Sequence, residues 1–103
     1  MSPGKNCLEV TGTLVELDRL RYTPAGVPIV QFRIRHESSQ EEAGLLRKVS
    51  CEVGCMAIDR EAKVLATAAL GETLWLKGFV DQKSRSSSQL VFHVTHLEFK
   101  KSN

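Results

Sequence analysis

The stretch that decides the fold runs over residues 19–36 and reads RLRYTPAGVPIVQFRIRH. A basic segment leads into a TPAG turn, and a second strand leaves that turn. Successive side chains of a strand point to opposite faces. The apolar face of this strand consists of Val30, Phe32 and Ile34, and the other face carries Gln31, Arg33 and Arg35. The pattern predicts a core-facing strand with an outer row of guanidinium groups, which suits either solvent or a phosphate backbone.

The rest of the chain continues mostly in strand-like patterns. Strands are expected over about residues 8–14, 28–36, 46–53, 73–80 and 90–99, with a polar loop over 37–44 and a serine-rich hairpin tip over 81–89. Residues 58–70 change to a helical period, and Gly71 stands where a C-terminal cap belongs. Gly12 inside the first strand predicts a bulge or a sharp bend.

Three strands, a helix and two strands form the element order of the OB-fold, a five-stranded Greek-key barrel. The sequence therefore predicts one all-β domain over residues 1–103, with one short helix between strands three and four and loose ends at 1–6 and 100–103. Such barrels bind oligonucleotides on one face and with the loops between strands one and two and between strands four and five. These loops carry Arg21, Tyr22, Lys83 and Arg85.

Composition narrows the function classes. The chain has 103 residues, a net charge of only +2 and an apolar fraction of 42%. The charge total does not argue for nucleic acid, so only its distribution could. Three cysteines, no apolar run long enough to span a bilayer and no signal-peptide pattern predict a cytosolic protein with reduced thiols.

A family resemblance rests on several of these residues. The segment LRYTPAGVPIVQF, residues 20–32, resembles bacterial single-stranded-DNA-binding proteins, and the likeness extends over most of the chain. The PriB family of primosomal replication proteins is a closer match. Its features occur in order and at the right spacing: Gly12-Thr13, the TPAG turn, Gln31-Phe32, His36 and the segment QEEAG at 40–44.

The resemblance implies a function and a set of partners. A PriB-like protein is a homodimer in the bacterial cytoplasm, associated with the nucleoid, without catalysis, cofactor or metal. It binds single-stranded DNA and the PriA helicase, works with other primosome proteins such as DnaT in replication restart, and helps to reload the replicative helicase. The dimer is expected through the first strand, by Leu8, Val10, Gly12 and Leu14.

The candidate DNA-binding residues are mostly cations, which neutralise phosphates, with one exposed aromatic ring for stacking. They are Arg21, Tyr22, Arg33, Arg35, Arg47, Lys48, Lys77, Lys83 and Arg85. The chain departs from the family where Ser50 replaces a tryptophan and where Glu37 stands at a position suited to a basic residue. Since each aromatic–base stack is worth about 1–3 kcal/mol, weaker DNA binding than the family norm is predicted.

Other functions compete with this interpretation. Cys51-x3-Cys55 and His93-x2-His96 offer a zinc-type ligand set, but the two histidines have opposite strand parity unless a bulge intervenes. No nucleophile-elbow or P-loop pattern supports an enzyme. A protein-interaction module on an OB scaffold with weak or no DNA binding, or a short general single-strand-binding protein, remains an alternative.

Overall fold

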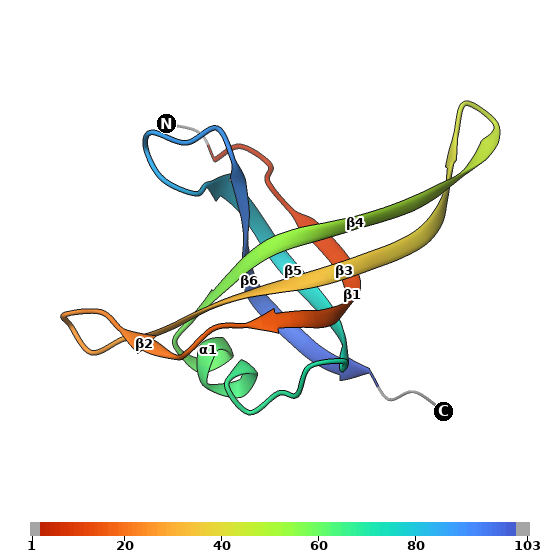
Figure 1. Cartoon of the computed structure of the whole chain (residues 1–103). Helices are drawn as coiled ribbons and strands as arrows, with labels where there is room; N and C mark the ends of the chain where they lie inside the picture. The colour runs from red at the N-terminus through yellow and green to blue at the C-terminus, as the bar shows by residue number, and fades with distance from the viewer. Residues whose placement is uncertain (1–2, 101–103) are drawn as a thin grey trace.

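The structure, a computed structural model that describes residues 3–100, is a closed β-barrel with one short helix at one end (Figure 1). Its elements are β1 (Leu8–Leu17), β2 (Arg21–Tyr22), β3 (Pro28–Glu42), β4 (Leu45–Ile58), α1 (Arg60–Leu65), β5 (Thr73–Gln82) and β6 (Leu90–Lys100). The strand order is β1-β5-β6-β4-β3-β2, and a β1–β3 pairing closes the barrel. The predicted fold is confirmed, although the two-residue β2 moves the helix to a place between the fourth and fifth strands in chain order.

The core fills the barrel interior. It consists of the apolar side chains that alternate along each strand and point inward. On β3 the predicted alternation is confirmed, because Val30, Phe32 and Ile34 are at most 4% exposed. The other buried apolar residues include Leu14, Leu74, Leu76, Phe92 and Val94. Their burial leaves the opposite parity of every strand on the outer surface, where a ligand can reach it.

β1 closes the barrel by pairing with two strands in succession. It pairs with β5 from Leu8 to Thr13 and with β3 from Thr13 to Leu17. The register shift lies between Leu14 and Glu16, so the bulge predicted at Gly12 is wrong. Gly12 serves a close approach instead, because a Cβ there would lie 2.8 Å from the Arg35 carbonyl oxygen.

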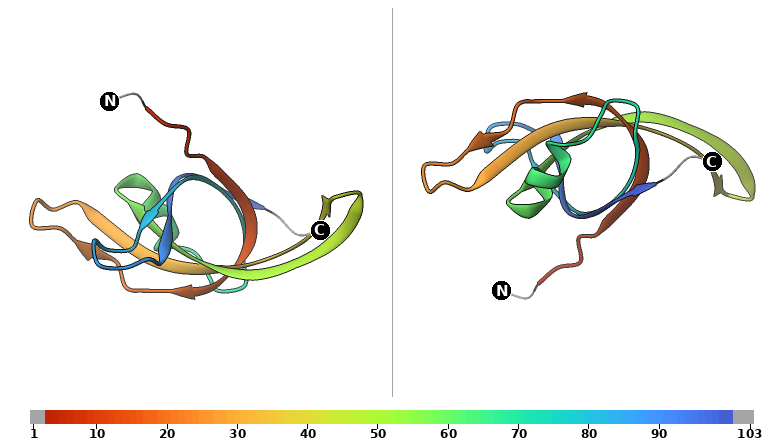
Figure 2. Two further views of the ribbon diagram at one scale, coloured as in Figure 1. Left: turned by 90° about the horizontal axis from the view of Figure 1, so that it is seen from above. Right: turned by 90° about the horizontal axis from the view of Figure 1, so that it is seen from below.

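The predicted polar loop over residues 37–44 is wrong. β3 and β4 stay paired as far as Glu42 and Leu45, and they leave the barrel as a long two-stranded ribbon (Figures 1 and 2). We call residues 37–50 the hairpin arm. Its turn is Ala43-Gly44, both with positive φ, which suits a tight hairpin. The polar composition of residues 37–44 indicated a loop. A two-stranded ribbon with both faces in solvent needs no alternating apolar residues, so such a composition also fits paired strands.

His36 fixes the root of the hairpin arm. Its Nδ1 donates to the Thr11 carbonyl oxygen at 2.7 Å, and its Nε2 contacts the Ser38 hydroxyl at 2.7 Å. Because that carbonyl belongs to β1, one side chain ties the arm to the strand that closes the barrel.

The helix is shorter than the predicted 58–70. Ile58 still pairs with Ile29 as part of β4, and Asp59 then turns the chain with a φ of 63°. The helix buries Ala62 and Leu65 against the barrel core and ends at a cap on Ala66. Gly71 is not this cap: its φ is 94°, and its N–H donates to the Leu14 carbonyl oxygen.

Two residues at the ends of the described chain, Asn6 and Lys100, contact the barrel. The Asn6 side chain bridges the backbone of Val80, with hydrogen bonds of 2.7 and 3.0 Å. Lys100 still pairs with Thr73 in the β5–β6 ladder. Residues 1–2 and 101–103 of the predicted loose ends lie outside the described residues. Within residues 3–100 no helix is long and apolar enough to cross a membrane.

Candidate nucleic-acid interface

A hollow of about 400 Å³ lies on the outer face of β3 and β4, between the end of β1 and the β5–β6 loop. We call it the first hollow. The charged and apolar side chains at its edges are Glu16, Asp18, Arg33, Glu52, Lys83 and Leu90. The predicted outer row on β3 and one of the two predicted basic loops therefore meet at one place.

Strand register places the charged groups of the hollow. Arg35 pairs directly with Glu52 across the β3–β4 ladder, and Arg33 pairs with Gly54 two residues further along. Residues two apart on a strand share a face, so both arginines and Glu52 point outward together. Gly54 leaves open space beside Arg33, whose Nη2 lies 3.9 Å from where a Cβ would be.

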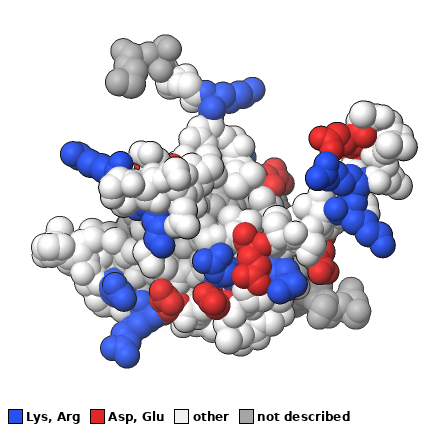
Figure 3. Space-filling model, turned by 45° about the horizontal axis from the view of Figure 1, so that its top comes forward, with Lys and Arg blue, Asp and Glu red and all other residues white. Residues whose placement is uncertain are grey.

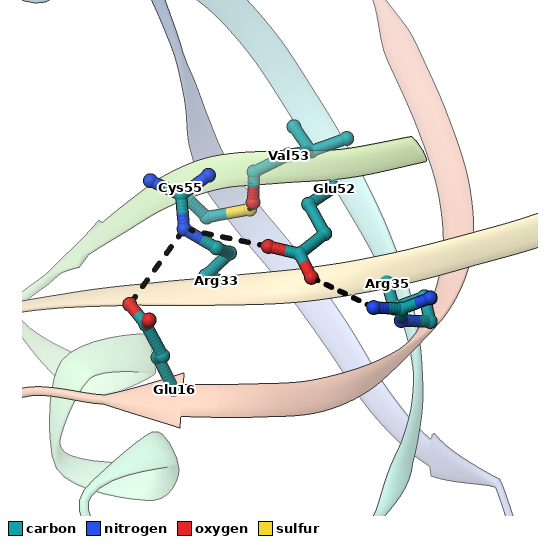
Figure 4. Close-up of polar contacts among 6 residues, drawn as sticks. All are labelled: Glu16, Arg33, Arg35, Glu52, Val53 and Cys55. Atoms are coloured by element: carbon teal, nitrogen blue, oxygen red, sulfur yellow. Dashed lines mark hydrogen bonds and ion pairs between the residues drawn. The ribbon is translucent and has the colours of Figure 1, made fainter. Parts of the chain in front are cut away.

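The arginine row is present, but it is not free (Figure 4). Glu52 accepts a hydrogen bond of 3.1 Å from Arg35 and lies 4.0 Å from the Arg33 Nε. Glu16 lies 3.6 Å from the same nitrogen. A phosphate that approaches this row must displace carboxylates, so the row gives less attraction than the sequence pattern indicates.

The face drawn in Figure 3 repeats this mixture of charges. Acidic and basic side chains lie beside one another over the face drawn in Figure 3, and no continuous basic stripe crosses it. Net charge is +2. Local clusters of cations must therefore carry any attraction for a polyanion.

Cys55 lies beneath this face. Its side chain is 2% exposed, and its thiol donates to the Val53 carbonyl oxygen at 3.4 Å. Burial raises the pKa of the Cys55 thiol to about 12, although the Arg33 charge opposes the shift. The thiol is therefore neutral at physiological pH, and it is unsuited to act as a nucleophile or as a thiolate ligand.

The hairpin arm carries two of the predicted DNA-binding residues. Arg47 pairs with Glu42 at 2.9 Å, whereas Lys48 has no ion pair among residues 3–100. Leu45 and Leu46, at the tip, are 73% and 81% exposed. Ser50 and Glu37, the two departures from the family pattern, face one another across the ladder.

The remaining predicted cations lie at the barrel edges and on its outer wall. Arg21 and Tyr22 form the exposed β2, and Lys83 and Arg85 lie in the β5–β6 loop. Lys77 is exposed on β5. In the part of the chain that the structure describes, none of these four cations has a carboxylate within ion-pair distance. Only Lys83 reaches the first hollow.

Sequence reasoning missed the acidic side of the first hollow. Glu16 and Asp18 lie at the end of β1, and Glu52 lies on β4. Their meeting with Arg33 depends on the β1–β3 register shift and on the β3–β4 register. Neither register can be inferred from the alternation of apolar and polar residues along one strand.

Of the predicted dimer residues, the three with apolar side chains turn toward the barrel core. Leu14 is fully buried, and Leu8 and Val10 pack against the core. Pairing of the first strand with a second copy stays a prediction, and it would have to use the backbone of this strand rather than these apolar side chains. Among the described residues, one backbone edge of β1 over Leu8–Gly12 has no strand partner, and its Thr11 carbonyl is held by His36.

The competing zinc set does not assemble. A register shift between Lys77 and Gly78 sets one extra residue into β6, so His93 and His96 both fall on the outer parity, contrary to the simple alternation. Cys55 points inward from β4, and Cys51 on the same strand is exposed. Among residues 3–100, no three His, Cys, Asp or Glu side chains come together as a metal site.

The chain is similar in sequence to known proteins. Residues 6–96 match the model of a family described as another single-strand binding protein family. The chain is similar to the replication restart protein PriB of Nitrosomonas europaea, with 38% identity over 90% of this chain and 86% of that protein. It is 32% identical to PriB of Bordetella pertussis, over 86% of this chain and 83% of the other.

Solved structures agree on the fold. PriB from Ralstonia solanacearum superposes with a TM-score of 0.86 and 36% identity, over 95% of this chain and all of that chain. The single-stranded DNA binding protein of Thermus aquaticus superposes with a TM-score of 0.76 at 18% identity, over 97% of this chain and 52% of that chain, and shares the barrel.

Proposed function

Because this chain belongs to the PriB family of replication restart proteins, within a single-strand binding protein family, we propose that it is a single-stranded-DNA-binding adaptor of the replication restart primosome. It holds unpaired DNA across the outer face of β3 and β4. It has no chemistry of its own there, and it passes the strand to partner proteins.

The observation that carries this proposal is the first hollow with cations on the segments around it. Lys83 reaches the hollow, Arg85 shares its loop, and Lys48 lies on the hairpin arm that continues β4. Exposed cations attract phosphates without reading sequence, which is what binding of any single strand requires. The ion-paired arginines and the exposed Ser50 keep the affinity modest.

The proposed partners follow the family. The adaptor binds the PriA helicase and acts with DnaT and other primosome proteins to reload the replicative helicase, in the cytoplasm at the nucleoid. It acts as a homodimer in which the backbone edge of β1 pairs with its copy. Over Leu8–Gly12 the edge of β1 that faces away from β5 has no strand partner among the described residues, although the Thr11 carbonyl accepts from His36. An unpaired strand edge is a ready template for another strand, which supports this pairing.

Fluorescence anisotropy of a labelled single-stranded oligonucleotide, titrated at two salt concentrations, tests the proposal. We expect salt-sensitive binding that Arg21→Ala and Lys83→Ala both weaken, each with a shallower salt dependence. Glu98→Gln, which alters a charge far along β6, is the control for general charge effects. No binding at low salt would contradict the proposal.

One observation favours a second candidate, a protein-interaction module with weak DNA binding. The arginines of the first hollow are already held by carboxylates, and the arm ends in two exposed leucines, Leu45 and Leu46. In that case Leu45→Ser would abolish binding of the PriA helicase while DNA binding stayed near its original weak level.

A further inference from the structure

A second hollow, of about 180 Å³, lies on the outer wall of the barrel, where β4, β6 and β5 run side by side (Figure 1). Phe79 of β5 and His93 of β6 are directly opposite one another in the ladder. Their rings stack with centroids 4.9 Å apart and planes within 3°. Both rings line this second hollow.

The second hollow is apolar and open to water. Met56, Ile58 and Val94 form its other apolar walls. Ile58 is 43% exposed and Phe79 is 38% exposed, so neither residue is needed for the barrel core. Among the described residues that line it, Glu61 alone carries a carboxylate, and this charge repels a phosphate but not an uncharged ring.

The second hollow continues the candidate DNA face. Met56 lines both hollows, and Val91 at the edge of the first lies two residues before His93 on β6. Lys77 lies two residues before Phe79 on β5, on the same outer face, and is exposed. A strand that leaves the first hollow past Met56 therefore meets two aromatic rings with a cation beside them.

We propose that the Phe79–His93 hollow is a base-stacking subsite for single-stranded DNA, an inference that rests on the proposed function. An unpaired nucleobase enters the hollow and extends the existing stack of two rings. Its phosphate lies outside, within reach of Lys77. Stacking on aromatic rings is the sequence-tolerant way to hold bases, and cations beside the rings hold the backbone.

The subsite also compensates for the lack of exposed aromatic rings in the first hollow and at Ser50 on the hairpin arm. The first hollow offers no exposed aromatic ring, because Phe32 beneath it is 4% exposed, and Ser50 on the arm provides none. Tyr22 is exposed on β2 but does not line either hollow, whereas the stacked pair lines a hollow that shares Met56 with the first.

Two measurements test this proposal on the full chain. The first compares oligothymidylate binding by Phe79→Leu with that by Phe99→Leu, a matched variant because Phe99 is 39% exposed on β6 and outside both hollows. Phe79→Leu should weaken binding about fivefold or more with an unchanged salt slope. Phe79→Tyr should keep the affinity, and Phe99→Leu should change nothing.

The second measurement uses the wild-type protein, so it does not depend on how a variant folds. Oligothymidylate with 5-iododeoxyuridine is irradiated in complex, and the cross-linked peptide is mapped by mass spectrometry. A cross-link at Phe79 or His93 supports the proposal. Cross-links confined to other residues would overturn it.

The outcomes separate this inference from the proposed function. If the wild-type protein binds DNA and Phe79→Leu binds equally well, the subsite is wrong and the proposed function stands. If Phe79→Leu loses the PriA helicase but not DNA, the hollow holds a protein side chain, and the proposal is again wrong. If the wild-type protein binds no oligonucleotide at low salt, both fail.

Discussion

Replacing Glu52 by glutamine is expected to strengthen the binding of single-stranded DNA. Glu52 holds Arg35 at 3.1 Å and lies 4.0 Å from the Arg33 Nε, so it occupies both arginines of the first hollow. Glutamine keeps the shape but carries no charge. Arg35 is then free for a phosphate, and Arg33 is left with Glu16 alone.

The magnitude follows from the number of phosphates gained. Each phosphate neutralised on a single strand steepens the logarithmic salt dependence by about 0.7. One to two extra contacts therefore steepen it by about 0.7–1.4, and the ratio of variant to wild-type affinity grows about three- to sevenfold between about 200 and 50 mM salt. The carboxylate and guanidinium groups are 42–51% exposed. Losing such pairs costs only about 0.2–1 kcal/mol each.

The assay is fluorescence anisotropy of a labelled oligonucleotide across that range of salt. The matched control is Glu98→Gln, which removes the same charge and breaks only the 3.6 Å contact with Lys100 on β6. An equal gain in both variants would mean that net charge alone sets the affinity. No gain in Glu52→Gln would refute the argument that carboxylates compete with phosphate in the first hollow.

Four further predictions concern stability and reactivity. Gly78→Ala should lower the free energy of unfolding by about 1–3 kcal/mol, seen as a lower melting temperature, because a Cβ there would clash with the backbone carbonyl of His93. Gly54→Ala, which has open space, should melt near the wild type. Leu14→Ala should cost about 2–5 kcal/mol of unfolding free energy in chemical denaturation, because the side chain fills the core. Alkylation at neutral pH should label exposed Cys7 and Cys51 and spare Cys55. Burial raises the Cys55 pKa from 9.0 to about 12, so its contribution to stability is full below pH 9.0 and is lost as pH rises towards 12; a Cys55→Ala variant should lack this loss in melting curves across that range.

Much of the fold could be predicted because its signals are local. The alternation on β3 and the order of strands and helix depend on residues that are neighbours in sequence, and burial follows that alternation. The hairpin arm could not be predicted in this way. Its composition is typical of a loop, and its strand pairing is a property of two segments rather than of one.

The same distinction between local and long-range signals applies to the candidate site. The sequence by itself determined which residues face outward on β3, which loops are basic and which family the chain resembles, since each depends on residue type and spacing. Only the tertiary structure decided that Glu16 and Glu52 neutralise the arginine row, that Leu14 is fully buried in the core, and that Phe79 stacks on His93. These facts depend on register between strands far apart in the chain, where a shift of one residue moves a side chain to the opposite face.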